Sequence, residues 1–301
     1  MMVQVYHSDR FVPPLPEGHR FPMDKYHLVR EQLLYEGTLR PDQLVEASPV
    51  CEDDILAVHT PGYWAAVSGL ALDARAQRRI GFPLSPQLVE RSRRSCQGTV
   101  AAACHALAHG IGLNLAGGTH HAYADHGEGF CLLNDMAIAA HKLLATGAVR
   151  QVLIVDLDVH QGNGTARIFA GDDRVFTFSM HGAGNYPLRK ERSDLDLALP
   201  DGTGDAVYLQ LLRTHLPRLI AQVRPDLIFY QAGVDVLVGD RLGKLALSRE
   251  GCRARDCEVL ETCHRHQIPV VVAMGGGYSA RLSDTVEAHA HTFRTAVALY
   301  G

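Results

Sequence analysis

The chain has 301 residues, of which 47% are hydrophobic and 21% are charged, a composition typical of a globular protein with a substantial core. Lys and Arg total 29 against 33 Asp and Glu, and this net charge of −4 excludes strong electrostatic attraction to nucleic acid or to an anionic membrane. The seven cysteines form no Cys-x-x-Cys pair, and we find neither a secretion signal nor an apolar run that could span a bilayer. We therefore expect a cytoplasmic protein, whose oligomeric state the sequence does not predict.

Short β-rich apolar runs alternate along the chain with longer segments of helical character. The predicted strands are Gly112–Leu115, Gln151–Val155, Val175–Met180, Asp226–Tyr230 and Pro269–Met274. The predicted helices are Gln97–Ala108, Asn134–Thr146, Ala206–Val223, Arg249–His266 and Ser279–Leu299. The alternation predicts one open α/β domain over residues 1–301, with a parallel sheet covered by helices on both faces. Ligands of such sheets bind beyond the carboxyl ends of the strands, so we expect the functional side chains there.

The first polar motif follows the predicted strand Gly112–Leu115 and ends in the adjacent histidines His120 and His121. Two neighbouring imidazoles beside a metal can take a proton from water and return it to a leaving amine. A satisfied surface pair of histidines would show the same pattern, so this motif alone does not decide the function. The turn that contains Gly129 and Phe130 is expected to bring an aromatic ring close to the pair.

The second motif places Asp156, Asp158 and His160 at the end of an apolar strand. Alternation along a strand predicts that these three side chains lie on one side, and they cannot share a buried site comfortably without a cation. Asp235 ends another apolar strand. If the two strands are neighbours, Asp158, His160 and Asp235 form a catalytic metal site with open positions, which suits Zn²⁺ and also Fe²⁺ or Mn²⁺.

The last motif, Gly275-Gly276-Gly277-Tyr278, again follows a predicted strand. Glycines let a tyrosine approach closely, and its hydroxyl could polarise a carbonyl group and stabilise an oxyanion. The alternative interpretations are a turn with a core tyrosine here and a helix N-cap at Asp235. Because all four complementary motifs fall at predicted strand ends, we favour a metal-dependent amide hydrolase.

These motifs resemble those of the histone deacetylases, in the arginase/deacetylase superfamily. The resemblance begins at His19 and continues through segments 58–63, 117–121, 129–131, 156–164 and 179–181 to Asp235 and 275–278. The segments 156–164 and 239–248 are most similar to class IV deacetylases and bacterial deacetylase-like amidohydrolases. The resemblance implies a single eight-stranded parallel sheet with helices on both faces.

The resemblance also implies roles for individual residues. Zn²⁺ would bind Asp158, His160 and Asp235, His121 would be the principal base and acid with His120 as its electrostatic partner, and Tyr278 would polarise the carbonyl group. Asp156 and Asn163 would hold the two histidines from behind. The substrate tunnel would be lined by Gly129, Phe130, Tyr186 and Gly276. A structural K⁺ would bind at Asp156, Asp158, His160, Ser179 and Met180.

The sequence departs from the family pattern in three places. Asn163 stands where class I members have an aspartate, which predicts a less basic His121 because an amide adds no negative charge. The aspartate that holds a peptide at the rim of class I enzymes has no clear counterpart. The arginine expected near Pro22 is also missing, and Lys25 or Arg30 would have to replace it.

The predicted function is a zinc-dependent deacylase that hydrolyses the amide of an acyl-lysine, acetyl or longer, in a peptide or protein to a free amine and a carboxylate. The first alternative is an acetylpolyamine amidohydrolase, which would keep the metal and act on small acetylated amines. A binding protein without turnover and an arginase-type hydrolase with two metals are less favoured. The first would be expected to lose at least one of the catalytic groups, and the second would need further Asp or His ligands.

Overall fold

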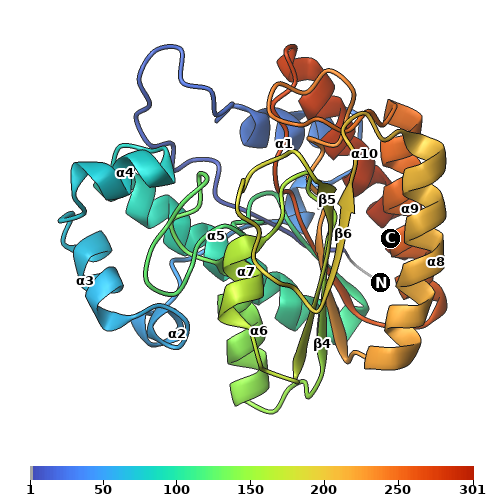
Figure 1. Cartoon of the computed structure of the whole chain (residues 1–301), viewed down its shortest axis with the longest axis horizontal. Coiled ribbons are helices and arrows are strands. Elements are labelled where there is room, and N and C mark those ends of the chain that lie inside the picture. Colours follow the sequence, from blue (N-terminus) through green and yellow to red (C-terminus); the bar gives the residue numbers. More distant parts are fainter. Residues whose placement is uncertain (1–2) are drawn as a thin grey trace.

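One parallel sheet of eight strands organises residues 3–301, the part of the chain that the computed structural model describes (Figure 1). The strands are β1 Val5–His7, β2 Leu44–Glu46, β3 Ile111–Asn114, β4 Val152–Asp156, β5 Val175–Gly182, β6 Leu195–Leu199, β7 Leu227–Gln231 and β8 Val270–Ala273. Their order in the sheet is β2-β1-β3-β8-β7-β4-β5-β6, and every neighbouring pair is parallel. The expected eight-stranded parallel sheet is confirmed.

Helices cover both faces of this sheet, as expected for strands joined by crossover connections (Figure 1). The helices are α1 Lys25–Tyr35, α2 Glu52–Leu56, α3 Pro61–Ser68, α4 Ala74–Ile80, α5 Pro86–His109, α6 Asp135–Ala145, α7 Asn163–Ile168, α8 Asp205–Val223, α9 Arg249–Arg265 and α10 Leu282–Tyr300, with a 3₁₀ turn at Pro41–Gln43. Helices α8, α9 and α10 lie on one side, and α5, α6 and α7 lie on the other. Among residues 3–301, no helix is both long and apolar enough to cross a membrane.

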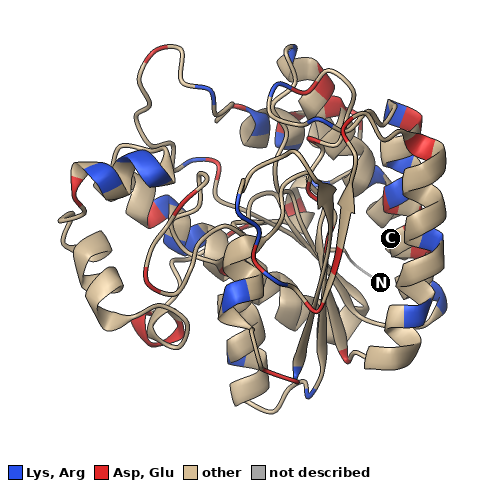
Figure 2. Cartoon of the chain, in the orientation of Figure 1, with Lys and Arg blue, Asp and Glu red and all other residues tan. Residues whose placement is uncertain are grey.

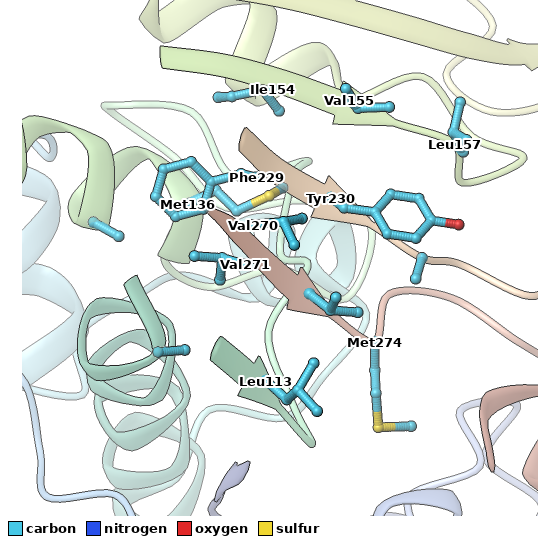
Figure 3. Packing of buried hydrophobic residues seen from close by; sticks show 14 of the residues in the cluster. Leu113, Met136, Ile154, Val155, Leu157, Phe229, Tyr230, Val270, Val271 and Met274 are labelled. Carbon is cyan, nitrogen blue, oxygen red and sulfur yellow. The ribbon is translucent and has the colours of Figure 1, made fainter. Parts of the chain in front are cut away.

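The central strands are buried throughout and are mostly apolar before their last residues, because helices exclude water from both of their faces. All five residues of β4 and of β7 are buried. Figure 3 shows Met136 of α6 among the side chains of these strands and of β8. Burying these continuous apolar runs supplies the main driving force for folding, at roughly 25 cal/mol per Å² of apolar surface.

Side-chain caps define where the helices flanking the site begin. Ser85 accepts a hydrogen bond from the amide of Leu88 at the start of α5, and Asn134 accepts one from Ala137 at the start of α6. Helix α5 ends at Gly110, whose φ of +89° is a left-handed conformation that suits glycine. These caps fix where α5 and α6 begin, and Gly110 fixes where α5 gives way to β3.

Several elements were not predicted from the residue pattern. Strands β1 and β2 have three residues each, and most of β6 is only partly buried, so their patterns are weak. Helix α5 begins at Pro86, well before the predicted Gln97, and α10 begins at Leu282 rather than Ser279. The short helices α1 to α4 and α7 were also missed, because none presents a long amphipathic stripe.

The four strands that carry the polar motifs are consecutive neighbours, β3, β8, β7 and β4. Their last residues lie in one row, because Asn114 is paired with Ala273, Ala273 with Gln231, and Gln231 with Asp156. The expected proximity of the strands before Asp158 and Asp235 is therefore confirmed. Strand β4 itself ends at Asp156, so Asp158 and His160 lie in the loop beyond it and not on the strand.

Arg255 of α9 connects the loops that follow β4 and β7. Its fully buried guanidinium donates to the carbonyl oxygens of Leu157 and Gly233, in the loops after β4 and β7. It also donates to Oδ1 of Asp256 at 2.9 and 2.7 Å. A buried charge needs such a paired and fully bonded environment, because isolated burial is costly.

We predict that Arg255→Met lowers the free energy of unfolding by about 3–5 kcal/mol, because the substitution leaves the Asp256 carboxylate buried without its partner. Urea denaturation would measure the loss. Arg253→Met provides the matched control, since Arg253 is exposed on the same helix and its replacement should change stability by less than about 0.5 kcal/mol. Equal stability of the two variants would contradict this role of Arg255.

Candidate metal centre and active site

Three residues converge where the loops after β4 and β7 meet. One potential ligand atom from each of Asp158, His160 and Asp235 lies within 4.8 Å of the others, and all three side chains are buried. The amide of Gly276 donates to Oδ2 of Asp158 at 2.8 Å, and the amide of Val159 donates to Oδ1 of Asp235 at 3.0 Å. Backbone groups therefore hold one oxygen of each carboxylate.

The environment of this cluster fits a bound cation. Oδ2 of Asp235 is buried and accepts no well-aligned hydrogen bond from the described residues, and Nδ1 of His160 lies 3.1 Å from it. Burial and the nearby charge of Asp158 raise the pKa of Asp235 to about 7, so two ionised carboxylates are unfavourable here without a positive ion. Two carboxylates and one imidazole suit Zn²⁺ and also Fe²⁺ or Mn²⁺.

Glycine is required at two positions beside the cluster. A Cβ atom at Gly276 would lie 1.9 Å from Oδ2 of Asp235, and one at Gly233 would lie 2.1 Å from Oδ2 of Asp158. Such distances are far below van der Waals contact. The glycines after β7 and β8 thus allow the backbone to close around the two carboxylates.

The paired histidines lie beside this cluster, with ring centroids 4.1 Å apart. His120 Nδ1 donates to Oδ2 of Asp156 at 2.7 Å, and His121 Nδ1 lies 2.7 Å from Oδ1 of Asn163. The turn before them is fixed by Asp135, which accepts hydrogen bonds from the amides of Gly118 and Thr119. The structure therefore brings both histidines and both residues predicted to lie behind them to the metal cluster.

The surroundings of Asn163 determine which nitrogen of His121 carries a proton. Nδ2 of Asn163 donates to Oε1 of Glu128 at 2.6 Å and to the hydroxyl of Tyr123 at 3.1 Å, so its Oδ1 atom must accept from His121. Neutral His121 therefore has its proton on Nδ1 and a free lone pair on Nε2. Glu128 is also hydrogen-bonded to the hydroxyl of Tyr186.

The two histidines have opposite electrostatic environments. Burial and the neighbouring His120 and His160 hold the pKa of His121 well below its usual range. Burial also disfavours the charge on His120, but the Asp156 carboxylate outweighs it and raises the pKa of His120. His121 is therefore neutral at neutral pH and able to accept a proton, as a general base must.

Tyr278 follows β8 and faces the same site. Its amide donates to Oδ2 of Asp240 at 2.6 Å, and its ring centroid lies 6.4 Å from that of His160. Burial, followed by the charges of Asp235 and Asp158, raises the pKa of Tyr278 well above its usual range. The hydroxyl therefore keeps its proton and can donate a hydrogen bond.

These groups surround a narrow chamber that leads into a wider cavity. The chamber has a volume of about 40 Å³ and is lined by His120, His121, Asp158, His160, Gly276 and Tyr278, among others. The outer cavity, of about 270 Å³, shares His121, Gly129, Phe130, His160 and Tyr278 with the chamber, and Tyr186 lies on its wall. All four predicted tunnel residues thus line one of these two connected spaces.

The remaining sequence-predicted positions are the K⁺ residues and the two candidates to replace the missing arginine. Ser179 of β5 is paired in register with Asp156, and Met180 is buried beside it, whereas K⁺ binding there stays a prediction. Lys25 is buried and donates to the carbonyl oxygen of Gly275 at 2.9 Å, directly behind Tyr278. Arg30 instead pairs with Asp9 at 3.0 Å, so only Lys25 reaches the wall of the site.

Sequence reasoning missed three groups around the site. Asp240 accepts hydrogen bonds from the amides of Leu242 and Gly243 as well as from Tyr278. It lies in the segment 239–248 that resembles class IV deacetylases, but the resemblance assigned it no role. Glu128 follows a glycine in the turn before Phe130, and its contact with Asn163 depends on the fold. The outer cavity is also lined by three arginines, Arg20, Arg78 and Arg79.

Comparison of the chain with known protein families and structures agrees with this site. The histone deacetylase domain matches residues 19–293. The chain is 48% identical over 296 residues to an uncharacterised protein of Picosynechococcus sp. (strain ATCC 27264 / PCC 7002 / PR-6), with 98% of each chain covered. It is 33% identical over 282 residues to histone deacetylase 2 of Arabidopsis thaliana, covering 89% of this chain and 73% of that protein.

The fold is similar to that of a solved deacetylase homologue. The crystal structure of an HDAC homologue complexed with SAHA superposes with a TM-score of 0.84 at 23% identity, covering 99% of this chain and 84% of the other. The domain match includes the metal cluster, the histidine pair and the tyrosine. The chain therefore belongs to the histone deacetylase family and is a hydrolase of acetylated amides.

Proposed function

We propose that this protein is a zinc-dependent deacetylase that hydrolyses the amide of acetyl-lysine side chains to a free amine and acetate. The observation that carries the proposal is the convergence of Asp158, His160 and Asp235 beside a histidine pair and a tyrosine at one end of a narrow chamber. A bound Zn²⁺ would supply Lewis-acid polarisation of the amide carbonyl and lower the pKa of water.

The side chains of the protein provide the other steps. His121 takes the proton of the attacking water through its free Nε2 atom, while Asn163 holds its Nδ1–H. Tyr278 donates a hydrogen bond to the amide oxygen as negative charge develops there. His121 then returns the proton to the departing amine. His120, charged beside Asp156, stabilises the negative charge from the other side.

The size of the inner chamber supports an acetyl group over a longer acyl chain. Its volume of about 40 Å³ is several times smaller than the 270 Å³ of the outer cavity. A short acyl group such as acetyl suits so small a space better than a long alkyl chain does.

The structure also weighs against the alternatives. An acetylpolyamine carries further ammonium groups, yet no carboxylate of the described residues lines the outer cavity. A two-metal arginase-type site needs more ligands than the one Asp-His-Asp cluster that residues 3–301 contain. A binding protein without turnover has no need for a histidine pair with opposite pKa shifts. The proposed cytoplasmic location is supported by the seven cysteines, which are all free.

The first prediction concerns the metal. Wild-type protein should bind about one Zn²⁺ per chain and lose turnover of an acetyl-lysine peptide after chelation, with recovery on adding Zn²⁺. Asp235→Ala should abolish metal binding, because it removes a ligand, whereas Asp201→Ala, at an exposed position, should not. Metal analysis and peptide turnover measure both effects. Full turnover by metal-free protein would refute the proposal.

The second prediction concerns Tyr278. Tyr278→Phe should lower kcat about 100- to 1,000-fold, because one donor to the developing oxyanion is lost. Metal content should remain that of the wild type, because Tyr278 is not one of the three ligands. Steady-state kinetics together with metal analysis separate the two effects, and an unimpaired variant would remove Tyr278 from the mechanism.

A further inference from the structure

Three guanidinium groups surround the outer cavity through which a substrate must pass. Arg20 lies in the loop before α1, and Arg78 and Arg79 lie in the last turn of α4. No aspartate or glutamate of the described residues contributes to the same lining. We name these three residues the arginine rim. The entrance therefore has a local charge opposite in sign to the net charge of the chain.

The two segments of the arginine rim are attached to the wall of the cavity and to each other. The amides of Gly129 and Phe130 donate to the carbonyl oxygens of Arg79 and Ile80 at 3.1 and 2.7 Å. His19, next to Arg20, is hydrogen-bonded through Nε2 to the carbonyl oxygen of Gly81 at 2.8 Å. The backbone of the rim is therefore held at a fixed place beside Phe130.

The charges of the arginine rim are available to a ligand. All three side chains are exposed, and none forms an ion pair within 4.0 Å with a carboxylate of residues 3–301. Asp73 interacts with Arg78 at longer range, but its carboxylate caps α4 by accepting from the amide of Ala76. Figure 2 shows Lys or Arg positions (blue) along α4, at the left of the view.

A cationic entrance acts on the groups that flank the acetylated amine. Acetylation removes the charge of the lysine itself, so the rim meets only the charges of neighbouring groups. Guanidinium groups attract carboxylates, often through two parallel hydrogen bonds, and repel ammonium groups. Charges that surround an entrance also change the rate of encounter, an effect that salt screens.

We propose that the arginine rim selects peptides in which the acetyl-lysine is flanked by aspartate or glutamate, and that it disfavours lysine-rich sequences and polyamines. The proposal rests on the proposed deacetylase function and adds the charge of the preferred substrate. Arg20, Arg78 and Arg79 are specificity residues, because they contact the flanks of the substrate and not the reacting amide.

The test compares kcat/KM for three blocked acetyl-lysine peptides that differ only in having aspartate, alanine or lysine at the flanking positions. At low ionic strength the aspartate peptide should exceed the lysine peptide by roughly five- to tenfold, since each exposed ion pair contributes little by itself. The ratio should decrease in high salt. Acetylputrescine should be a poorer substrate than the alanine peptide.

Two variants of α4 distinguish the effect of the arginine rim from a general effect of the net charge of the protein. The double variant Arg78→Glu and Arg79→Glu should reverse the order of the aspartate and lysine peptides. Arg75→Glu is the matched control, because Arg75 is exposed on the same helix and does not line the cavity, so the wild-type ratio should persist. Thermal melting confirms that both variants are folded, and the ratio between peptides is independent of the amount of active enzyme.

The proposed selectivity of the arginine rim would be overturned by any of three results. These are equal efficiencies for the three peptides, a preference for lysine flanks, or an unchanged ratio in the double variant. A higher efficiency with acetylputrescine than with the alanine peptide would also overturn it. Failure of the wild-type holoenzyme to hydrolyse any peptide would instead overturn the deacetylase function. The two failures are therefore distinguishable in the same set of assays.

Discussion

The alignment of four strand ends is the constraint on which this site depends. Asn114, Ala273, Gln231 and Asp156 lie in one row, so the loops that follow β3, β8, β7 and β4 begin at the same level of the sheet. The loop after β3 contributes two imidazoles, the loop after β8 a phenol, the loop after β7 a carboxylate, and the loop after β4 a carboxylate and an imidazole. Parallel pairing imposes this proximity even though the loops come from distant parts of the sequence.

Bringing polar groups to one buried edge is costly unless each of them is satisfied. The protein meets this requirement with backbone amides at one oxygen of each ligand carboxylate and with Asp156 and Asn163 behind the histidines. Arg255 uses the same principle one layer below, where its guanidinium bonds to the carbonyl oxygens of both ligand loops. Oδ2 of Asp235 is the exception, because it accepts no well-aligned hydrogen bond and lies 3.1 Å from His160 in the cluster that could hold a metal.

The sequence predicted the central part of this arrangement and missed its periphery. The polar residues Asp158 and His160 can be recognised as a candidate site because they follow an apolar run abruptly. The sequence does not predict that β4 and β7 are neighbours, because strand order depends on long-range packing. Helix α4 is too short for a periodic pattern, so nothing in its sequence indicated that Arg78 and Arg79 border a cavity. Asp240 lies in a segment that resembles the family, but its role was missed because its bonds to backbone amides depend on the folded loop.

The shared carboxylate of Glu128 has a consequence for how the enzyme can diversify. It bonds at once to Asn163, which orients His121, and to Tyr186 on the cavity wall. A change at position 186 that widened the passage would also remove one partner of Glu128, whose other contacts are with His126 and Asn163. The width of the passage and the support of His121 through Asn163 thus share one carboxylate in this protein, so a variant with a wider passage would need another group to replace the lost contact.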